Sequence, residues 1–369
     1  MSAVIGYARQ LPRRIAATFD LPLLVALSLV MAIGLAVLHS ASGERMALLV
    51  PQALRFVAGV AAMLVIAQIP PSRMRVWTPW VYVGTLALLL VVPLLGSGRS
   101  GRHWLNLGVF YLQPAELMKL SVPMMVAWVI QRRPLPPGWY TAALAAVALG
   151  VPAALIAMQP DLGTAVPVAA SGVFVIFLGG FAWWRIALIG TGALALAPLG
   201  WAFLKDYQRN RLLTFLHPET DPLGIGWNIM QSKIAVGSGG LWGKGWGQGS
   251  QAHLQFLPEQ TTDFIFAVLS EEFGWVGVCV LLLLYLFILG RCLWIASVAR
   301  DTYSRLLAGA LALTFFVYVF VNGGMISGLL PVVGVPMPLL SYGGTSAVSL
   351  LAGFGVVMSV HAHRKLMGP

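Results

Sequence analysis

Ten stretches of this sequence approach the length and apolarity that a membrane-spanning helix needs, and they constrain the fold more than any other feature. A spanning helix needs about 20 mostly apolar residues. Over the 369 residues of the chain, 59% are hydrophobic and 9% are charged, a balance that few soluble folds could bury. The stretches are 21–40, 48–67, 77–95, 117–130, 140–158, 164–181, 186–204, 273–293, 306–321 and 346–360. The sequence therefore predicts an all-α, polytopic membrane protein of about ten transmembrane helices, with residues 1–369 forming a single domain.

Charged residues are distributed unequally between the two sides of these predicted helices. The basic residues of the termini and of alternate connections are Arg9, Arg13, Arg14, Arg73, Arg75, Arg132, Arg133, Arg185, Arg300, Arg305, Arg364 and Lys365. This positive-inside pattern predicts that both termini are cytoplasmic, and it accounts for the net charge of +11 without nucleic acid as a partner. Most acidic residues fall on the opposite side, namely Glu44, Glu116, Asp161, Asp206, Glu219, Asp221, Glu259 and Asp263. We therefore expect the chemistry of a cytoplasmic (inner) membrane protein to take place on its outer face.

Three connections are longer than the rest, and all three are predicted to face outward. One long loop covers 205–262, and two shorter loops cover 96–113 and 323–345. They are rich in glycine and proline, which break regular helices and favour turns or partly inserted segments. Long loops of this kind are often functional.

Glu116 and Lys119 lie three residues apart near the outer end of the fourth predicted helix. This spacing places both side chains on one helix face, where they can pair. One interpretation is a structural ion pair that fixes helix packing. The alternative is a polar cavity wall that contacts a substrate head group, because charges at membrane depth usually face a bundle interior or a wet cavity.

Two aspartates stand at the outer ends of predicted helices. Asp161, in QPDLGT, lies where the fifth helix gives way to the sixth, and it either caps the sixth helix or takes part in a reaction. Asp263 closes the long outer loop after Thr261 and Thr262. It is either an N-cap or a general base, since a carboxylate in a partly dry cavity has a raised pKa and becomes a better base.

The outer loops also carry cations and one unusual tryptophan. The cations are Arg102, Lys205, Arg209, Arg211, Lys233 and Lys244. They either contact lipid phosphates without specificity or bind a diphosphate together with glycine-rich backbone. Most tryptophans fit the interfacial belt of a membrane protein, but Trp104 lies within a glycine-rich outer loop beside Arg102. We therefore count Trp104 and Arg102 as candidate substrate-binding residues.

Four stretches of the sequence resemble the SEDS family, the shape, elongation, division and sporulation proteins. They are GRHWLNLGVFYLQPAELMKL, QPDLGTA, GWNIMQSKIAVGSGGLWGKGWGQGSQAHLQFLPEQTTDFIFAVLSEEFG and SGLLPVVGVPMPLLSYGGTS. The resemblance covers nearly the whole chain and favours the elongation branch over the division branch. It implies a ten-helix polymerase that uses lipid II outside the cytoplasmic membrane.

The same resemblance assigns roles to particular residues. Asp263 matches the essential aspartate of the family, and Trp104 matches the tryptophan of its first outer loop. Glu116, Lys119 and Asp161 match further family residues. Asp263 would deprotonate the acceptor hydroxyl, and undecaprenyl diphosphate would leave. The resemblance also implies a class B penicillin-binding transpeptidase as partner.

The leaving diphosphate needs positive charge, and the sequence leaves its source open. Lys119, Arg209, Lys233 and Lys244 are candidates, and a divalent cation is an alternative. The histidines show no zinc-ligand spacing, and the sequence leaves any further cofactor undetermined. Two other functions remain open, because a lipid II flippase or a non-catalytic scaffold for the transpeptidase would show the same helices and charges.

Overall fold

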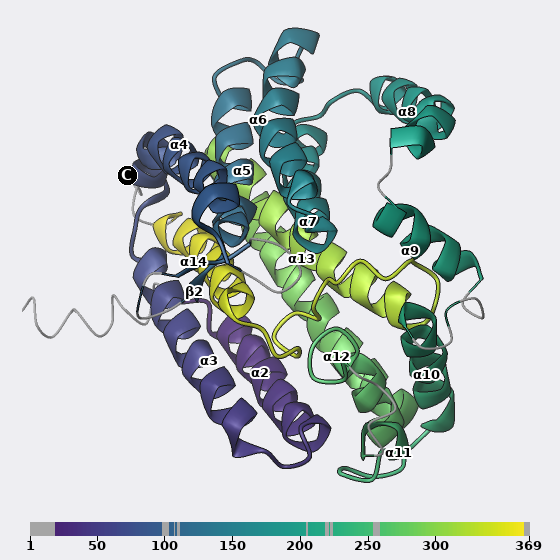
Figure 1. Ribbon diagram of the computed structural model, residues 1–369. Coiled ribbons are helices and arrows are strands. Elements are labelled where there is room, and N and C mark those ends of the chain that lie inside the picture. Colours follow the sequence, from purple (N-terminus) through teal and green to yellow (C-terminus); the bar gives the residue numbers. More distant parts are fainter. Residues whose placement is uncertain are drawn as a thin grey trace, which may run out of the picture.

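The structure, a computed structural model, describes residues 19–97, 103–106, 108, 111–203, 206–217, 221, 224–253 and 259–364. Figure 1 shows a bundle of long helices with one small hairpin. The helices are α2 (Leu21–Ala41), α3 (Met46–Ala67), α4 (Pro71–Leu95), α5 (Pro114–Ile130), α6 (Trp139–Met158), α7 (Leu162–Leu178), α8 (Trp183–Phe203), α9 (Asp206–Leu216), α10 (Ile225–Ser238), α11 (Ser250–His253), α12 (Ile265–Ser297), α13 (Thr302–Ile326) and α14 (Thr345–His363). The hairpin consists of β1 (Leu105–Asn106) and β2 (Tyr111–Leu112), paired antiparallel with Leu105 opposite Leu112.

The predicted class, an all-helical polytopic membrane protein, is confirmed. Seven of the described helices, α2, α3, α4, α6, α12, α13 and α14, are long and apolar enough to cross a membrane. The remaining predicted stretches lie on α5 and α7, which have 17 residues each, and on α8, which has 21. Figure 1 shows α8 at the edge of the molecule, away from α5 and α6.

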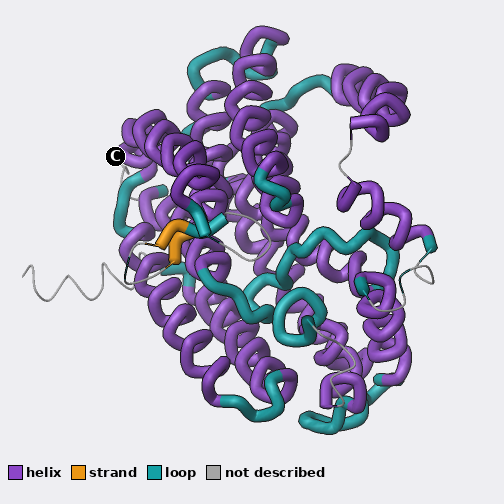
Figure 2. Tube along the Cα trace, in the orientation of Figure 1, coloured by secondary structure: helices purple, strands orange, loops and turns teal. Residues whose placement is uncertain are grey.

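The outer connections contain more regular structure than the sequence indicated. The long loop 205–262 was predicted to be turns or partly inserted segments, but it includes α9, α10 and the short α11. Its glycine-poor parts form these helices, while the glycine-rich part, 239–249, forms turns. The connection after α4 contains the β1–β2 hairpin. After α13 the chain crosses the bundle as a loop, 327–344, before α14 begins (Figure 2).

Two glycines allow α3 and α14 to pack closely together. A Cβ on Gly59 would lie 2.6 Å from Leu351 Cδ1, and a Cβ on Gly355 would lie 2.7 Å from the Met63 carbonyl oxygen. Small residues at such positions let helix backbones approach each other, which drives helix association in lipid. Residues of both α3 and α14 line the site described below.

Helix α12 is broken at Gly274, whose φ of 61° and ψ of −161° are not helical. The glycine-rich segment 239–249 supplies partners for the backbone groups that the break releases. Lys244 N and Gly245 N donate to the carbonyls of Glu271 and Glu272, each at 3.0 Å. Trp275 N and Val276 N donate to the carbonyls of Gly240 and Leu241, at 2.9 and 3.1 Å. This pairing gives hydrogen-bond partners to the backbone groups on both sides of the break.

Candidate active site

A cavity of about 870 Å³ opens between α3, α5, α14 and the β1–β2 hairpin. Its polar lining includes Arg55, Trp104, Glu116 and Thr345, and its apolar lining includes Leu117, Leu120, Val348 and Ala352. The Trp104 ring lies 3.5 Å from the position that a Cβ would take on Gly344, just before α14. The cavity thus combines an apolar wall with a few polar groups, as binding sites usually do.

Glu116, which lines this cavity, forms a buried ion pair with Lys119. The distance from Lys119 Nζ to Glu116 Oε1 is 2.7 Å, and Ser349 Oγ donates to Glu116 Oε2 at 2.6 Å. Lys119 Nζ also lies 5.0 Å from the ring centroid of Tyr318. Glu116 stands in the first turn of α5, where a negative charge complements the helix dipole. The predicted pairing is confirmed, and contact with a substrate head group stays a prediction.

Asp161 caps α7 and ties it to the start of α5. Its Oδ1 accepts a hydrogen bond from Thr164 N at 3.0 Å, so the predicted capping role is confirmed. Its Oδ2 accepts a second bond from Gln113 Nε2 at 2.7 Å. Because Gln113 immediately precedes α5, this bond holds Asp161 beside the helix that carries Glu116 and Lys119.

Asp263 lies in the turn before α12, and its side chain is half-buried. The N-cap position of α12 is taken by Phe264, not by Asp263, so the capping role that the sequence left open for Asp263 is not the arrangement observed. Asp263 Oδ2 lies 3.5 Å from the position of a Cβ on Gly334. A Cβ on Gly163, in the first turn of α7, would collide with the carbonyl oxygen of the same Gly334. Gly334 therefore lies close to both the start of α7 and the Asp263 carboxylate.

Two further contacts hold the Asp263 turn in place. The buried side chain of Asn322, on α13, donates through Nδ2 to the carbonyls of Asp263 at 2.9 Å and Val335 at 2.7 Å. Tyr342 N donates to the Thr261 carbonyl at 2.8 Å, and the Tyr342 ring centroid lies 4.6 Å from the guanidinium carbon of Arg55. The turn that carries Asp263 is thus attached to a residue that touches the cavity lining.

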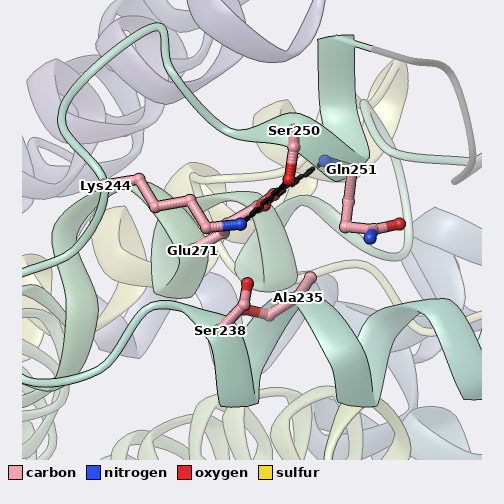
Figure 3. Close-up of polar contacts among 6 residues, drawn as sticks. All are labelled: Ala235, Ser238, Lys244, Ser250, Gln251 and Glu271. Carbon is pink, nitrogen blue, oxygen red and sulfur yellow. Dashed lines mark hydrogen bonds and ion pairs between the residues drawn. The ribbon is translucent and has the colours of Figure 1, made fainter.

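The remaining predicted cations lie away from this arrangement. Lys244 pairs with the fully buried Glu271 at 2.6 Å, and Figure 3 shows Lys244 and Ser250 converging on that carboxylate. Lys233 is exposed on α10 and packs against Gly328, and Arg209 lies on α9. None of these three is among the described residues that line the cavity. Arg102, Lys205 and the side chain of Arg211 lie outside the described residues.

The sequence interpretation missed four polar residues of this region, namely Arg55, Tyr318, Asn322 and Ser349. Each is a polar residue within an otherwise apolar stretch. That feature was the available signal, because polar groups at membrane depth usually face an interior or a cavity. In the described part of the chain, no group of three His, Cys, Asp or Glu side chains is arranged to hold a metal ion.

Comparison with known proteins agrees with this architecture. Residues 14–366 match the profile of the FtsW, RodA and SpoVE family, described as a cell cycle protein. Among curated proteins, the peptidoglycan glycosyltransferase MrdB of Escherichia coli (strain K12) is 49% identical over 333 residues, which cover 90% of this chain and 90% of MrdB. Stage V sporulation protein E of Bacillus subtilis (strain 168) is 34% identical over 361 residues, covering 94% of this chain and 98% of that protein.

Solved structures are similar along nearly the full length. A chain from a peptidoglycan synthase complex, in a study of how polymerization and crosslinking are coordinated, gives a TM-score of 0.82 at 32% identity, covering 94% of this chain and 98% of that chain. The rod shape determining protein RodA of Thermus thermophilus gives a TM-score of 0.72 at 30% identity, with the same coverage.

Proposed function

This chain belongs to the FtsW, RodA and SpoVE family, and from that membership and the cavity we propose that it is a peptidoglycan glycosyltransferase with Asp263 as general base. It polymerises lipid II into glycan strands on the outer face of the cytoplasmic membrane, with both termini in the cytoplasm. The similarity to MrdB and to RodA supports a role in elongation rather than division, and it favours a polymerase over a lipid II flippase.

The reaction joins the 4-hydroxyl of an N-acetylglucosamine to C1 of an N-acetylmuramic acid. The hydroxyl oxygen forms the new bond to C1 while the bond from C1 to the diphosphate oxygen breaks. The hydroxyl proton passes to the Asp263 carboxylate, and undecaprenyl diphosphate leaves as an anion without needing a proton. A carboxylate that deprotonates the attacking oxygen is the logic of inverting glycosidases.

One observation carries the assignment of Asp263. Its half-buried carboxylate lies beside Gly334, and its turn is joined by Tyr342 to Arg55, which lines the cavity. The cavity itself, with Trp104 and Glu116, supplies the binding surface for the lipid-linked sugar. Lys119 is joined to this surface through its ion pair with Glu116. Binding roles for Arg102, Arg209, Lys233 and Lys244 stay predictions.

Similarity to a solved complex also supports a partner protein for this chain. One structural neighbour comes from a peptidoglycan synthase complex. We therefore include in the proposal a class B penicillin-binding transpeptidase that crosslinks the strands this chain makes.

The test is glycan polymerisation from lipid II by the purified protein with its transpeptidase partner, comparing wild type with Asp263→Asn. General base catalysis typically contributes about 10²–10⁴-fold in rate, and we expect a loss of that size. Asp301→Asn is the matched control, because Asp301 caps α13 through Ser304 N at 3.0 Å and lies outside the cavity lining. Equal polymer from wild type and Asp263→Asn would exclude Asp263 as the base. If the intact wild-type complex makes no polymer, the result would favour the alternative function, a lipid II flippase.

A further inference from the structure

Arg55 brings a guanidinium group to the cavity from a membrane-spanning helix. It lies on α3, nine residues after Met46, which corresponds to about 14 Å along the helix axis. Its side chain is half-buried and lines the same cavity as Trp104 and Glu116. A guanidinium at such a position needs an interaction that offsets the free-energy cost of removing it from water.

The charge of Arg55 is not neutralised by an acidic side chain among the described residues. Arg55 takes part in none of the ion pairs within 4.0 Å found among them, which include those of Lys119, Lys244, Arg291 and His361. Arg55 instead has a long contact of 3.5 Å from Nη1 to Gln52 Oε1 and lies over the Tyr342 ring. Lys119, in contrast, already has Glu116 as its counter-ion. Arg55 is therefore the cavity cation that remains available to an anionic ligand.

The N-terminus of α14 faces the same cavity. Gly344 and Thr345, where α14 begins, are lining residues, and the Thr345 Oγ1 atom is buried with no hydrogen-bond partner among the described groups. The free N–H groups and the dipole at a helix N-terminus favour a negative charge. A phosphate placed near Arg55 would therefore meet a second source of positive potential.

We propose that Arg55 binds a phosphate of the polyprenyl diphosphate in the substrate, together with the N-terminus of α14. A guanidinium can give two parallel hydrogen bonds to phosphate oxygens. The apolar wall formed by Leu117, Leu120 and Val348 suits the polyprenyl chain. Because Tyr342 contacts Arg55 and also binds Thr261, the phosphate lies on the side of the cavity nearest the Asp263 turn. This inference rests on the proposed function for the identity of the ligand.

The test measures binding without turnover, in full-length protein in detergent. The probes are geranylgeranyl diphosphate, geranylgeraniol and phosphatidylglycerol, and the proteins are wild type, Arg55→Met, Arg55→Lys and Arg45→Met. We expect Arg55→Met to weaken geranylgeranyl diphosphate binding by about tenfold to a hundredfold, with Arg55→Lys intermediate. Geranylgeraniol binding should not change. Arg45→Met is the matched control, because Arg45 is exposed at the start of the same helix and does not line the cavity.

Three results would overturn the proposal. Arg55→Met could bind geranylgeranyl diphosphate as tightly as wild type does. It could lose geranylgeraniol equally, which would indicate a change in cavity shape. Phosphatidylglycerol could compete as well as the diphosphate, which would identify a phospholipid site instead. This binding test is independent of the polymerisation test of Asp263. The Asp263→Asn protein should bind geranylgeranyl diphosphate as tightly as wild type does, whether or not Asp263 is the base.

Discussion

The Glu116–Lys119 pair can be either a structural ion pair or part of the substrate surface, and paired substitutions separate these roles. Glu116→Gln leaves the buried Lys119 ammonium without its carboxylate, so we expect a loss of about 3–5 kcal/mol in the free energy of unfolding. Glu116→Gln combined with Lys119→Met removes both charges and should recover most of that loss. The measurement is the melting temperature in detergent, followed by polymerisation from lipid II. A double variant that is stable but inactive indicates substrate contact, whereas one that is stable and active indicates a structural pair. Equal destabilisation of both variants would contradict the argument.

Residue-level prediction from the sequence succeeded where partners lie close together in the chain. Glu116 and Lys119 are three residues apart, as are Asp161 and Thr164, so helix geometry alone brings each pair together. Asn322 and Arg55 were missed because each has a partner that is distant in sequence. Asp263 lies 59 positions before Asn322, and the ring that Arg55 contacts belongs to Tyr342. A lone polar residue in an apolar stretch shows that a partner exists, but it does not identify that partner.

Asn322 offers a prediction about how the Asp263 turn is held. Its side-chain amide donates to two carbonyls, and Asn322→Asp would replace the donor with a carboxylate oxygen facing both carbonyls. Leaving such groups unsatisfied costs about 1–3 kcal/mol each. We expect a lower melting temperature and a larger fall in polymerisation than the stability loss explains, because Asp263 moves. Thr314→Val is the matched control, since Thr314 lies on the same helix and its hydroxyl donates to the Ala310 carbonyl one turn earlier, at 2.7 Å. Wild-type polymerisation by Asn322→Asp would contradict this role.

At the scale of the elements, α12 shows where sequence periodicity was insufficient. The apolar pattern predicted a helix over 273–293, whereas α12 begins at Ile265 and continues across the break at Gly274. The residues before the break include Glu271 and Glu272, which are fully buried. Two adjacent acidic residues argued against a membrane helix when only the composition was considered. Lys244 pairs with Glu271, and Ser40 Oγ donates to Glu272. These partners come from distant segments, so the local sequence could not reveal them.

The break in α12 predicts different effects for two glycines of one helix. Gly274 has a φ of 61°, and a Cβ there would lie 2.7 Å from the Leu241 carbonyl oxygen. Gly274→Ala should cost about 1–3 kcal/mol in strain and should displace the glycine-rich segment 239–249. We expect reduced polymerisation, because the short helical part between the break and Asp263 would lose its anchor. Gly290→Ala is the matched control, with no atom within 4 Å of the added Cβ, and it should be neutral or stabilising by up to about 1 kcal/mol. The measurements are the melting temperature and the polymer yield of each variant. Equal values for Gly274→Ala and Gly290→Ala would contradict the prediction.

At the scale of the whole molecule, the sequence predicted a polytopic helical bundle, because each spanning stretch must satisfy its own backbone within lipid. It predicted about ten spanning helices, and seven of the described helices are long and apolar enough to span. It could not predict which helices pack together, since in lipid that choice depends on shape. The close contact of α3 with α14 depends on Gly59 and Gly355, which are distant in sequence. The cavity lies beside this contact, so its location became visible only in the assembled bundle.

The Asp20 cluster, formed by Asp20, Arg291 and His361, joins α2, α12 and α14. Arg291 Nη2 donates to Asp20 Oδ2 at 2.7 Å and Arg291 Nε donates to the same carboxylate at 3.0 Å. The His361 ring lies 3.5 Å from Asp20 Oδ2. Burial alone would raise the pKa of the Asp20 carboxyl, but the hydrogen bonds from Arg291 and Leu23 N, with the charges of Arg291 and His361, outweigh it and hold the pKa below its ordinary value of 3.8.

This depressed pKa predicts how the stability of the bundle depends on pH. Because the folded-state pKa lies below 3.8, the ionised Asp20 adds stability at pH values above 3.8, and that contribution is lost as the pH falls through the folded-state pKa. Asp20→Asn should therefore lower the melting temperature at pH 7, by an amount corresponding to about 1.5–3 kcal/mol for the lost charge-assisted hydrogen bonds. The difference from wild type should shrink as the pH is lowered from 5 to 3. Melting curves of both proteins in detergent across this range provide the measurement, and a difference that stays constant with pH would show that the ionisation of Asp20 does not hold the three helices together.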